Sequence, residues 1–130
     1  MIPLCREERI GITPYSPLAR GFVTGERRLG DFGDTVRSKT DEYLKSHYYR
    51  PSDFTVVERL TEIARKRGVP NVQLALAWLL HQPGITAPIV GASKMQHLED
   101  AVAALDVKLD SAELRALAEP YQPHPVLGHS

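Results

Sequence analysis

Only two stretches of this chain have the composition of a buried β-strand, and this most limits the folds it can adopt. They are 10–15, "IGITPY", and 86–90, "TAPIV". Helical patterns separate and follow them, and alternating strands and helices predict βαβ units with a parallel sheet. Two parallel strands alone leave unpaired backbone groups along their outer edges. We therefore expect the 130 residues to be part of a larger α/β domain, or to pair with another chain.

Four boundaries define the two helices expected between these strands. Ser52 or Asp53 is the predicted N-cap of the first helix, and Gly68 is its predicted end. Pro70 is expected to open the second helix, which "QPG" at 82–84 stops. The second helix is apolar on nearly all sides, including at Trp78, so we expect it to be buried widely.

Capping boxes predict two further helices after the second strand. Ser93 with Gln96, and Asp110 with Glu113, have the spacing in which an N-cap side chain and an N3 side chain bond each other's backbone. Apolar residues continue the helical period after Ser93, at Met95, Leu98, Val102 and Leu105. Residues 1–10 are expected to end a helix before Gly11, and the proline-rich tail is expected to be irregular.

A polar segment at 25–51 has no clear period. A loop of this length is usually functional or disordered. One interpretation is a surface loop without a specific role. Tyr43, Tyr48 and Tyr49 favour instead a loop that packs against another part of the protein.

Charge and cysteine content exclude several classes of protein. Lys plus Arg equal Asp plus Glu at 16 each, so a generic nucleic-acid binder is disfavoured. Cys5 is the single cysteine, and a buried inert thiol is the expected state. No apolar run approaches the roughly 20 residues of a membrane span, and no secretory signal is recognisable. We expect a cytoplasmic protein with no membrane or nucleic-acid partner and no metal site. His124 and His129 are expected to be surface residues.

Each strand leads into a turn of small residues with a cation. After 86–90 come Gly91, Ala92, Ser93 and Lys94, with His97 one helical turn on. A helix N-terminus binds anions through its free N–H groups and its dipole, so this turn could hold a phosphate. An ordinary capped helix with a surface lysine is the alternative. The turn after 10–15, "YSPLARG", has similar features, and barrel enzymes often bind phosphate at the loops after their last strands.

Three segments together resemble the aldo-keto reductase family. They are "PYSPLARGFVTG", "LALAWLLHQPGITAPIVGAS" and "LEDAVAALDVKLDSAELRAL". Nearly the whole chain resembles the C-terminal part of a bacterial branch that acts on small aldehydes and ketones. The resemblance implies a (β/α)8 TIM barrel, of which residues 1–130 would supply the last two strands, their helices and an extra C-terminal helix.

The resemblance also implies NADP(H) bound across the C-terminal face of that barrel. The pyrophosphate would lie along Ser16, Pro17, Leu18, Ala19, Arg20 and Gly21. Gly91, Ala92, Ser93 and Lys94 would surround the adenosine 2′-phosphate, with His97 and Asp100 further along the helix. Two positions depart from the family pattern: His97 replaces a common Gln or Arg, and Ala101 replaces an Asn that contacts adenine. Preference for NADPH over NADH is therefore less firmly implied than cofactor binding.

The family's catalytic Asp, Tyr, Lys and His have no counterpart in this sequence. They belong to the first half of the barrel, and Tyr15, Tyr43 and His47 do not match their motifs. The leading hypothesis is the cofactor-binding part of an oxidoreductase that reduces aldehydes and ketones, with the chain alone inactive. The alternative is a non-catalytic remnant, or an interaction module that self-associates through unpaired strand edges. A third interpretation, a piece of another phosphate-binding barrel, would require the three-segment match to arise by chance.

Overall fold

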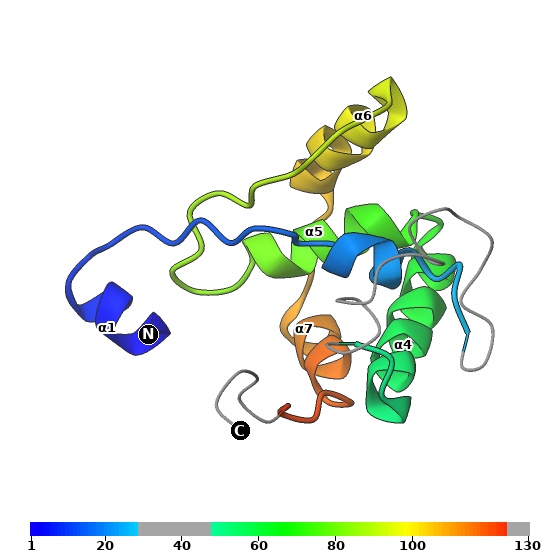
Figure 1. Ribbon diagram of the computed structural model, residues 1–130, viewed down its shortest axis with the longest axis horizontal. Coiled ribbons are helices and arrows are strands. Elements are labelled where there is room, and N and C mark those ends of the chain that lie inside the picture. Colours follow the sequence, from blue (N-terminus) through cyan, green and yellow to red (C-terminus); the bar gives the residue numbers. More distant parts are fainter. Residues whose placement is uncertain (29–47, 125–130) are drawn as a thin grey trace.

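A computed structural model describes residues 1–28 and 48–124, and these ranges are mostly helical (Figure 1). Helices α4 and α7 lie close together with α5 beside them, whereas α1 and α6 project away on two sides. The helices are α1 (Ile2–Glu7), the 3₁₀ helix η1 (Ala19–Thr24), α4 (Pro51–Arg67), α5 (Asn71–Leu80), α6 (Met95–Ala103), the 3₁₀ helix η2 (Ala104–Asp106) and α7 (Ser111–Ala118).

The main core lies where α4, α5 and α7 meet. Leu74 and Ala77 of α5 are completely buried, and Ala64 of α4 is nearly so. Leu117 of α7 closes the cluster from the other side. Trp78 packs against this core and donates its indole N–H to the Leu114 carbonyl at 3.4 Å. The expected wide burial of α5 is confirmed.

The start of α4 differs from the prediction by two or three residues. Arg50 is the N-cap, and the Asp53 carboxylate at position N3 accepts its backbone N–H at 3.0 Å. Pro51 fits the first position because the missing N–H has no intrahelical partner there. The helix ends as expected at Gly68, whose φ of +68° suits a residue without a side chain.

The boundaries of α5 and α7 agree with the sequence. Pro70 is the N-cap of α5. Asp110 is the N-cap of α7, and its carboxylate accepts the Ala112 and Glu113 N–H groups at 2.8 Å. The Glu113 carboxylate in turn accepts the Asp110 backbone N–H at 3.1 Å. This capping box satisfies donors that a helix start otherwise leaves without partners.

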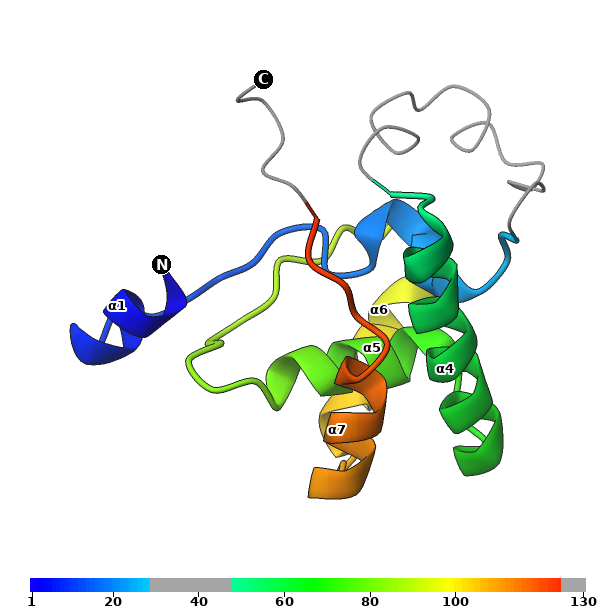
Figure 2. The same ribbon diagram turned by 90° about the horizontal axis from the view of Figure 1, so that it is seen from below.

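The two predicted strands pair in parallel but form only isolated bridges. Ile12 bridges Ile85, and Tyr15 bridges Ile89, so the two extended segments run side by side (Figure 2). No longer strand occurs in residues 1–28 or 48–124. The prediction of buried strands is wrong here, since Tyr15 is 75% exposed and Ile89 57% exposed. A strand without a second neighbour leaves a row of backbone N–H and C=O groups unpaired along its outer edge.

Helix α6 starts one residue later than expected and lacks the predicted capping box. Lys94 is its N-cap, with no side-chain capping bond, so the assignment of Ser93 as N-cap is wrong. None of its residues is buried. The helical period of its apolar residues is confirmed, but the apolar side faces solvent rather than a core.

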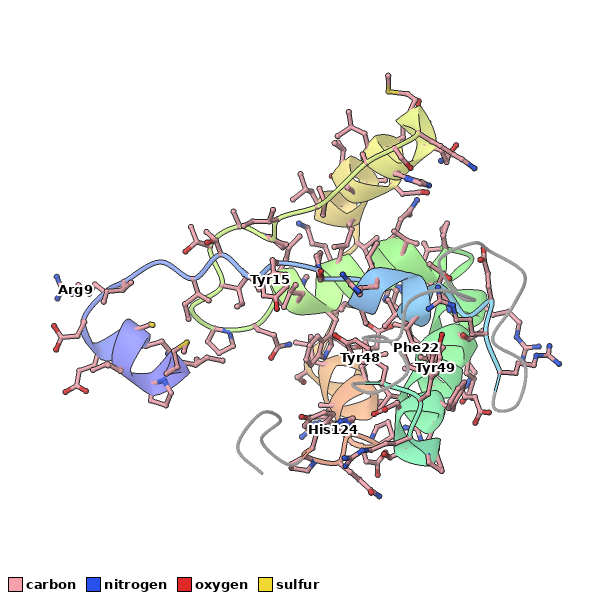
Figure 3. The ribbon with its side chains drawn as sticks, viewed as in Figure 1. Arg9, Tyr15, Phe22, Tyr48, Tyr49 and His124 are labelled. Atoms are coloured by element: carbon pink, nitrogen blue, oxygen red, sulfur yellow. The ribbon has the colours of Figure 1, made fainter. Side chains whose placement is uncertain are left out.

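Four aromatic rings form a second, smaller core. Phe22 of η1 lies 5.1 Å from Phe54 of α4, 5.3 Å from Tyr49 and 6.1 Å from Tyr48, measured between ring centroids. Figure 3 shows Phe22, Tyr48 and Tyr49 gathered beside α4. The expectation that the tyrosines pack is confirmed for Tyr48 and Tyr49, while Tyr43 lies outside the described residues.

Three smaller expectations can also be compared with the structure. Helix α1 ends at Glu7, four residues before Gly11, and Cys5 is half-buried rather than buried. His124 is not a free surface residue: its Nε2 lies 2.6 Å from Asp53 Oδ1, and its side chain is 19% exposed. His129 lies outside the described residues. Across the described ranges, no helix is both long and apolar enough to cross a membrane.

Candidate functional site

Parallel pairing brings the two small-residue turns to the same edge of the molecule. The Ile12 carbonyl accepts the Thr86 N–H at 2.8 Å, and the Pro14 carbonyl accepts the Ile89 N–H at 2.8 Å. Thr86 also accepts the Ile12 N–H on its hydroxyl at 3.2 Å. Because both segments run in the same direction, the chain leaves them on the same side, at Ser16 and just after Val90.

The first turn, Ser16–Gly21, has an unusually strained backbone. Ser16, Ala19 and Arg20 have φ values of +51°, +46° and +56°, and left-handed conformations cost non-glycine residues about 1–2 kcal/mol each. Gly21 continues the run at +87°. Backbone bonds from Ala19 to Ser16 and from Gly21 to Leu18, both 2.9 Å, hold the turn closed. Strain of this kind is typical of ligand-binding loops.

Arg27 supports this turn from behind, which the sequence does not indicate. Its Nη2 donates to the Arg20 carbonyl at 3.5 Å and lies 3.7 Å from the place a side chain on Gly21 would occupy. Arg27 is only 8% exposed. Within residues 1–28 and 48–124 its Nη1 has no hydrogen-bond partner. Its sequence neighbourhood is a short basic run, which gives no sign that the guanidinium turns inward.

The second turn, Gly91–Lys94, is exposed and leads directly into α6. His97 folds back over the helix start, where its Nδ1 accepts the Ser93 N–H at 3.4 Å. His97 therefore occupies one of the N–H groups that a phosphate at this position would use.

Lys94 and Asp100 have different surroundings. Lys94 is exposed at the N-cap, where a flexible ammonium adds to the positive end of the helix dipole. Asp100 is half-buried, and its Oδ1 accepts the Gln73 amide at 2.8 Å, which ties α6 to α5. The structure thus brings the two turns to one edge, but it gives Asp100 a bond that orients the helix.

Other potential sites lie away from these turns. A surface hollow is lined by Arg50, Pro51, Ser52, Thr55, Gln122 and Pro123, none of which belongs to either turn. The Asp53–His124 pair lies beside it in sequence. Among the described residues, no group of three or more His, Cys, Asp or Glu side chains could hold a metal ion.

Parallel-paired extended segments that alternate with helices are typical of an α/β protein. The chain belongs to the aldo/keto reductase family, whose sequence model matches residues 1–122. This family has the (β/α)8 barrel fold and generally uses NAD(P)H. The parallel pairing agrees with that fold, although the described ranges contain bridges rather than full strands.

Three fungal relatives illustrate the match. A Schizosaccharomyces pombe protein that carries the provisional name aryl-alcohol dehydrogenase is 41% identical over 128 residues, covering 98% of this chain and 35% of the relative. Versiconal hemiacetal acetate reductase of Aspergillus parasiticus is 36% identical, with 95% and 36% covered. Aldo-keto reductase yakc of S. pombe, whose name specifies NADP(+), is also 36% identical, with 95% and 36% covered.

The chain spans about a third of the length of these relatives. The expected family is confirmed. The expected bacterial branch is not confirmed, because these three relatives come from fungi.

Proposed function

We propose that this chain is the dinucleotide-binding, C-terminal part of an NADPH-dependent aldo/keto reductase. The observation that carries the proposal is the pair of parallel bridges, Ile12 to Ile85 and Tyr15 to Ile89. They bring the turns that follow the two extended segments to one edge of the molecule. One relative with NADP(+) in its name supports the choice of cofactor.

The first turn would lie along the cofactor pyrophosphate. Ser16, Pro17, Leu18, Ala19, Arg20 and Gly21 would form this wall, which includes the left-handed run at 19–21. Arg27 behind the turn would keep that strained backbone in place.

The second turn would hold the adenosine 2′-phosphate. Gly91, Ala92 and Ser93 allow close approach and contribute backbone N–H groups, while Lys94 contributes charge. His97 must release the Ser93 N–H, or rotate, for the phosphate to take it. Asp100 would keep α6 in position through Gln73.

In the intact enzyme, NADPH held by this chain would supply the hydride that reduces the carbonyl of an aldehyde or ketone. A tyrosine outside this chain would protonate the carbonyl oxygen, assisted by a lysine and a histidine. Residues 1–130 would bind and orient the cofactor. The 130-residue chain alone is expected to reduce no aldehyde with NADPH, and turnover by it would contradict this division of roles.

The 2′-phosphate assignment is tested by substituting Lys94 in a complete barrel. The chain replaces the matching segment of the yakc relative, and the dissociation constants for NADPH and NADH are measured by fluorescence titration. Lys94→Ala is expected to weaken NADPH binding about tenfold or more, because a hydrogen bond to a charged group is lost. NADH binding should not change.

Lys108→Ala is the matched control. Lys108 is an exposed lysine whose ammonium bonds the Leu105 carbonyl at 3.0 Å, away from the turn. It should leave both constants unchanged. If Lys94→Ala weakened NADPH and NADH equally, or neither, the 2′-phosphate site would have been assigned to the wrong residues.

A self-associating, non-catalytic module remains the second candidate, and the exposed apolar residues on α6 favour it. Sedimentation of the chain at several concentrations separates the two. A concentration-dependent dimer that binds no dinucleotide in any barrel context would support the module.

A further inference from the structure

Two amide side chains at the start of α5 hold two different elements of the molecule. The Asn71 amide donates to the Val23 carbonyl of η1 at 3.4 Å, and the Gln73 amide donates to Asp100 Oδ1 of α6 at 2.8 Å. Residues two apart in sequence point about 160° away from each other on a helix of 3.6 residues per turn. The two side chains can therefore hold η1 and α6 on different sides of α5, and both elements contact α5 (Figure 1).

Asn71 is held between η1 and α4. Its amide nitrogen also donates to the Thr61 hydroxyl of α4 at 2.7 Å, and that hydroxyl donates to the Val57 carbonyl at 2.8 Å. Gly25 follows η1 with a φ of +85°, and a Cβ atom there would lie 2.6 Å from the Asn71 amide nitrogen. The absence of a side chain at Gly25 thus allows the end of η1 to approach Asn71 closely.

The contact at Asn71 is connected to the first turn through η1. The first three residues of η1, 19–21, belong to that turn and include its left-handed run. Val23, which accepts the Asn71 amide, lies two residues after Gly21. The Thr24 hydroxyl donates to the Gly21 carbonyl at 2.9 Å and joins the end of η1 to the turn. A change at Asn71 should therefore alter the position of the first turn.

The contact at Gln73 is connected to the second turn through α6, which begins directly after Lys94. No residue of α6 is buried in the described part of the chain, so its position depends on contacts such as the one between Gln73 and Asp100. Hydrogen bonds to a carboxylate are stronger than those between neutral groups. Leu74, next to Gln73, is completely buried, which fixes the start of α5 in the main core.

We infer that Asn71 and Gln73 are positioning residues, which hold the first and second turns at one fixed separation. The inference rests on the proposed function, in which the first turn lies along the pyrophosphate and the second turn holds the 2′-phosphate. A ligand that contacts both turns gains most when their separation already matches the distance between its phosphates, because its second contact then needs no further ordering. The two amides therefore increase the affinity for NADPH, but not for a ligand that contacts one turn.

The test compares two ligands in a complete barrel, in which this chain replaces the matching segment of the yakc relative. NADPH would contact both turns. Adenosine 2′-monophosphate has the 2′-phosphate but no pyrophosphate, so it would contact only the second turn. Asn71→Ala and Gln73→Ala should each weaken NADPH binding about fivefold, the effect of losing one hydrogen bond. Both variants should change the dissociation constant of adenosine 2′-monophosphate by less than about twofold.

Gln82→Ala is the matched control. Gln82 lies just past the other end of α5, and its amide donates to the Trp78 carbonyl at 2.9 Å. The control therefore removes the same kind of bond away from both turns, and it should leave both dissociation constants unchanged. The double variant Asn71→Ala/Gln73→Ala should weaken NADPH by less than the product of the two single effects, because losing one contact already releases the separation.

Hydrogen exchange in the 130-residue chain tests the two contacts without a ligand. Asn71→Ala should speed the exchange of the Gly21 and Gly25 amides about fivefold, and Gln73→Ala should speed the exchange of α6 amides by a similar factor. Neither variant should change exchange in α7, and Gln82→Ala should change none of these amides.

Three results would overturn the inference. They are equal weakening of both ligands by Asn71→Ala, which would indicate a general loss of structure, fully multiplicative effects in the double variant, and unchanged hydrogen exchange in both single variants. The proposed function fails separately. An unmodified barrel that binds neither ligand would contradict the proposed function, whereas NADPH binding that Lys94→Ala weakens but Asn71→Ala and Gln73→Ala do not would contradict this inference alone.

Discussion

The α4–α5–α7 cluster differs from the region formed by α6 and the two bridged segments in how fully its side chains are buried. In the cluster, Leu74 and Ala77 have no exposed surface, and both α4 and α7 end or begin at a formed cap. In the other region, α6 has no buried residue and the bridges stand alone. The buried members of the cluster all lie between Leu60 and Leu117, whereas each bridged segment has only the other as its neighbour among the described residues. This difference predicts that truncating a side chain destabilises the fold more in the cluster than in α6.

The most direct test of this comparison is to truncate one leucine in each region. Leu74→Ala should lower the free energy of unfolding by about 2–5 kcal/mol, the range for removing a fully buried leucine. Leu98→Ala should lower it by about 0.5 kcal/mol or less, as at other exposed positions. Urea unfolding followed by circular dichroism measures both. Similar losses would mean that α6 is packed in the isolated chain.

The next largest effect concerns Asp53, which joins the start of α4 to the tail. Its two oxygens contact the Arg50 N–H and His124 Nε2. Asp53→Ala should cost about 1–3 kcal/mol, because it leaves the Arg50 N–H without a partner. His124→Ala should cost less, and the double variant should show coupling. Asp106→Ala, at an exposed position, serves as control; additive losses at 53 and 124 would exclude a contact between them in solution.

A smaller effect distinguishes a formed helix cap from an absent one. Asp110→Ala should destabilise the chain by about 1 kcal/mol, the usual value for an N-cap. Ser93→Ala should have almost no effect on unfolding, since its side chain makes no capping bond to α6. Thermal melts of the two variants check this. A loss at Ser93 equal to that at Asp110 would show that the capping box of α6 forms after all.

The smallest effect is electrostatic and lies on the surface of α4. The hydrogen bond and charge of Lys66 lower the pKa of Glu62, with a lesser contribution from Arg59. Lys66→Gln should raise that pKa toward its ordinary value, and Arg59→Gln should raise it less; carboxyl NMR titration measures both. A depressed pKa stabilises the folded chain above the unfolded-state pKa, and this contribution disappears as the pH falls through the folded-state pKa. An unchanged Glu62 pKa in Lys66→Gln would show that the contact does not persist in solution.

Features set by neighbouring residues can be predicted from the sequence. Gly68 as the end of α4 and Asp110 with Glu113 at the start of α7 depend only on local backbone chemistry, and both are confirmed. The parallel direction of the two extended segments follows from the helices between them. The start of α4 is predicted too late along the chain, because an acidic side chain suits both the N-cap and the N3 position. Asp53 lies at N3, where it bonds to the backbone of the N-cap residue Arg50.

Features that depend on distant partners cannot be predicted in the same way. The burial expected for the segments at 10–15 and 86–90 requires neighbours on both sides, and the described residues supply only one. The sequence predicts an exposed His124 because nothing near it indicates a bond to Asp53, 71 positions away. The inward turn of Arg27 likewise depends on the strained backbone at 19–21. The roles of the two turns in cofactor binding stay predictions.

The contact of Phe22 with Tyr48 and Tyr49 has a consequence for how this protein can vary. These rings join two points well separated along the chain, with centroid distances of 6.1 and 5.3 Å. Phe22 also contacts Phe54 at 5.1 Å, so the rings fasten η1 to the start of α4. Substitution of any one ring should therefore affect both elements.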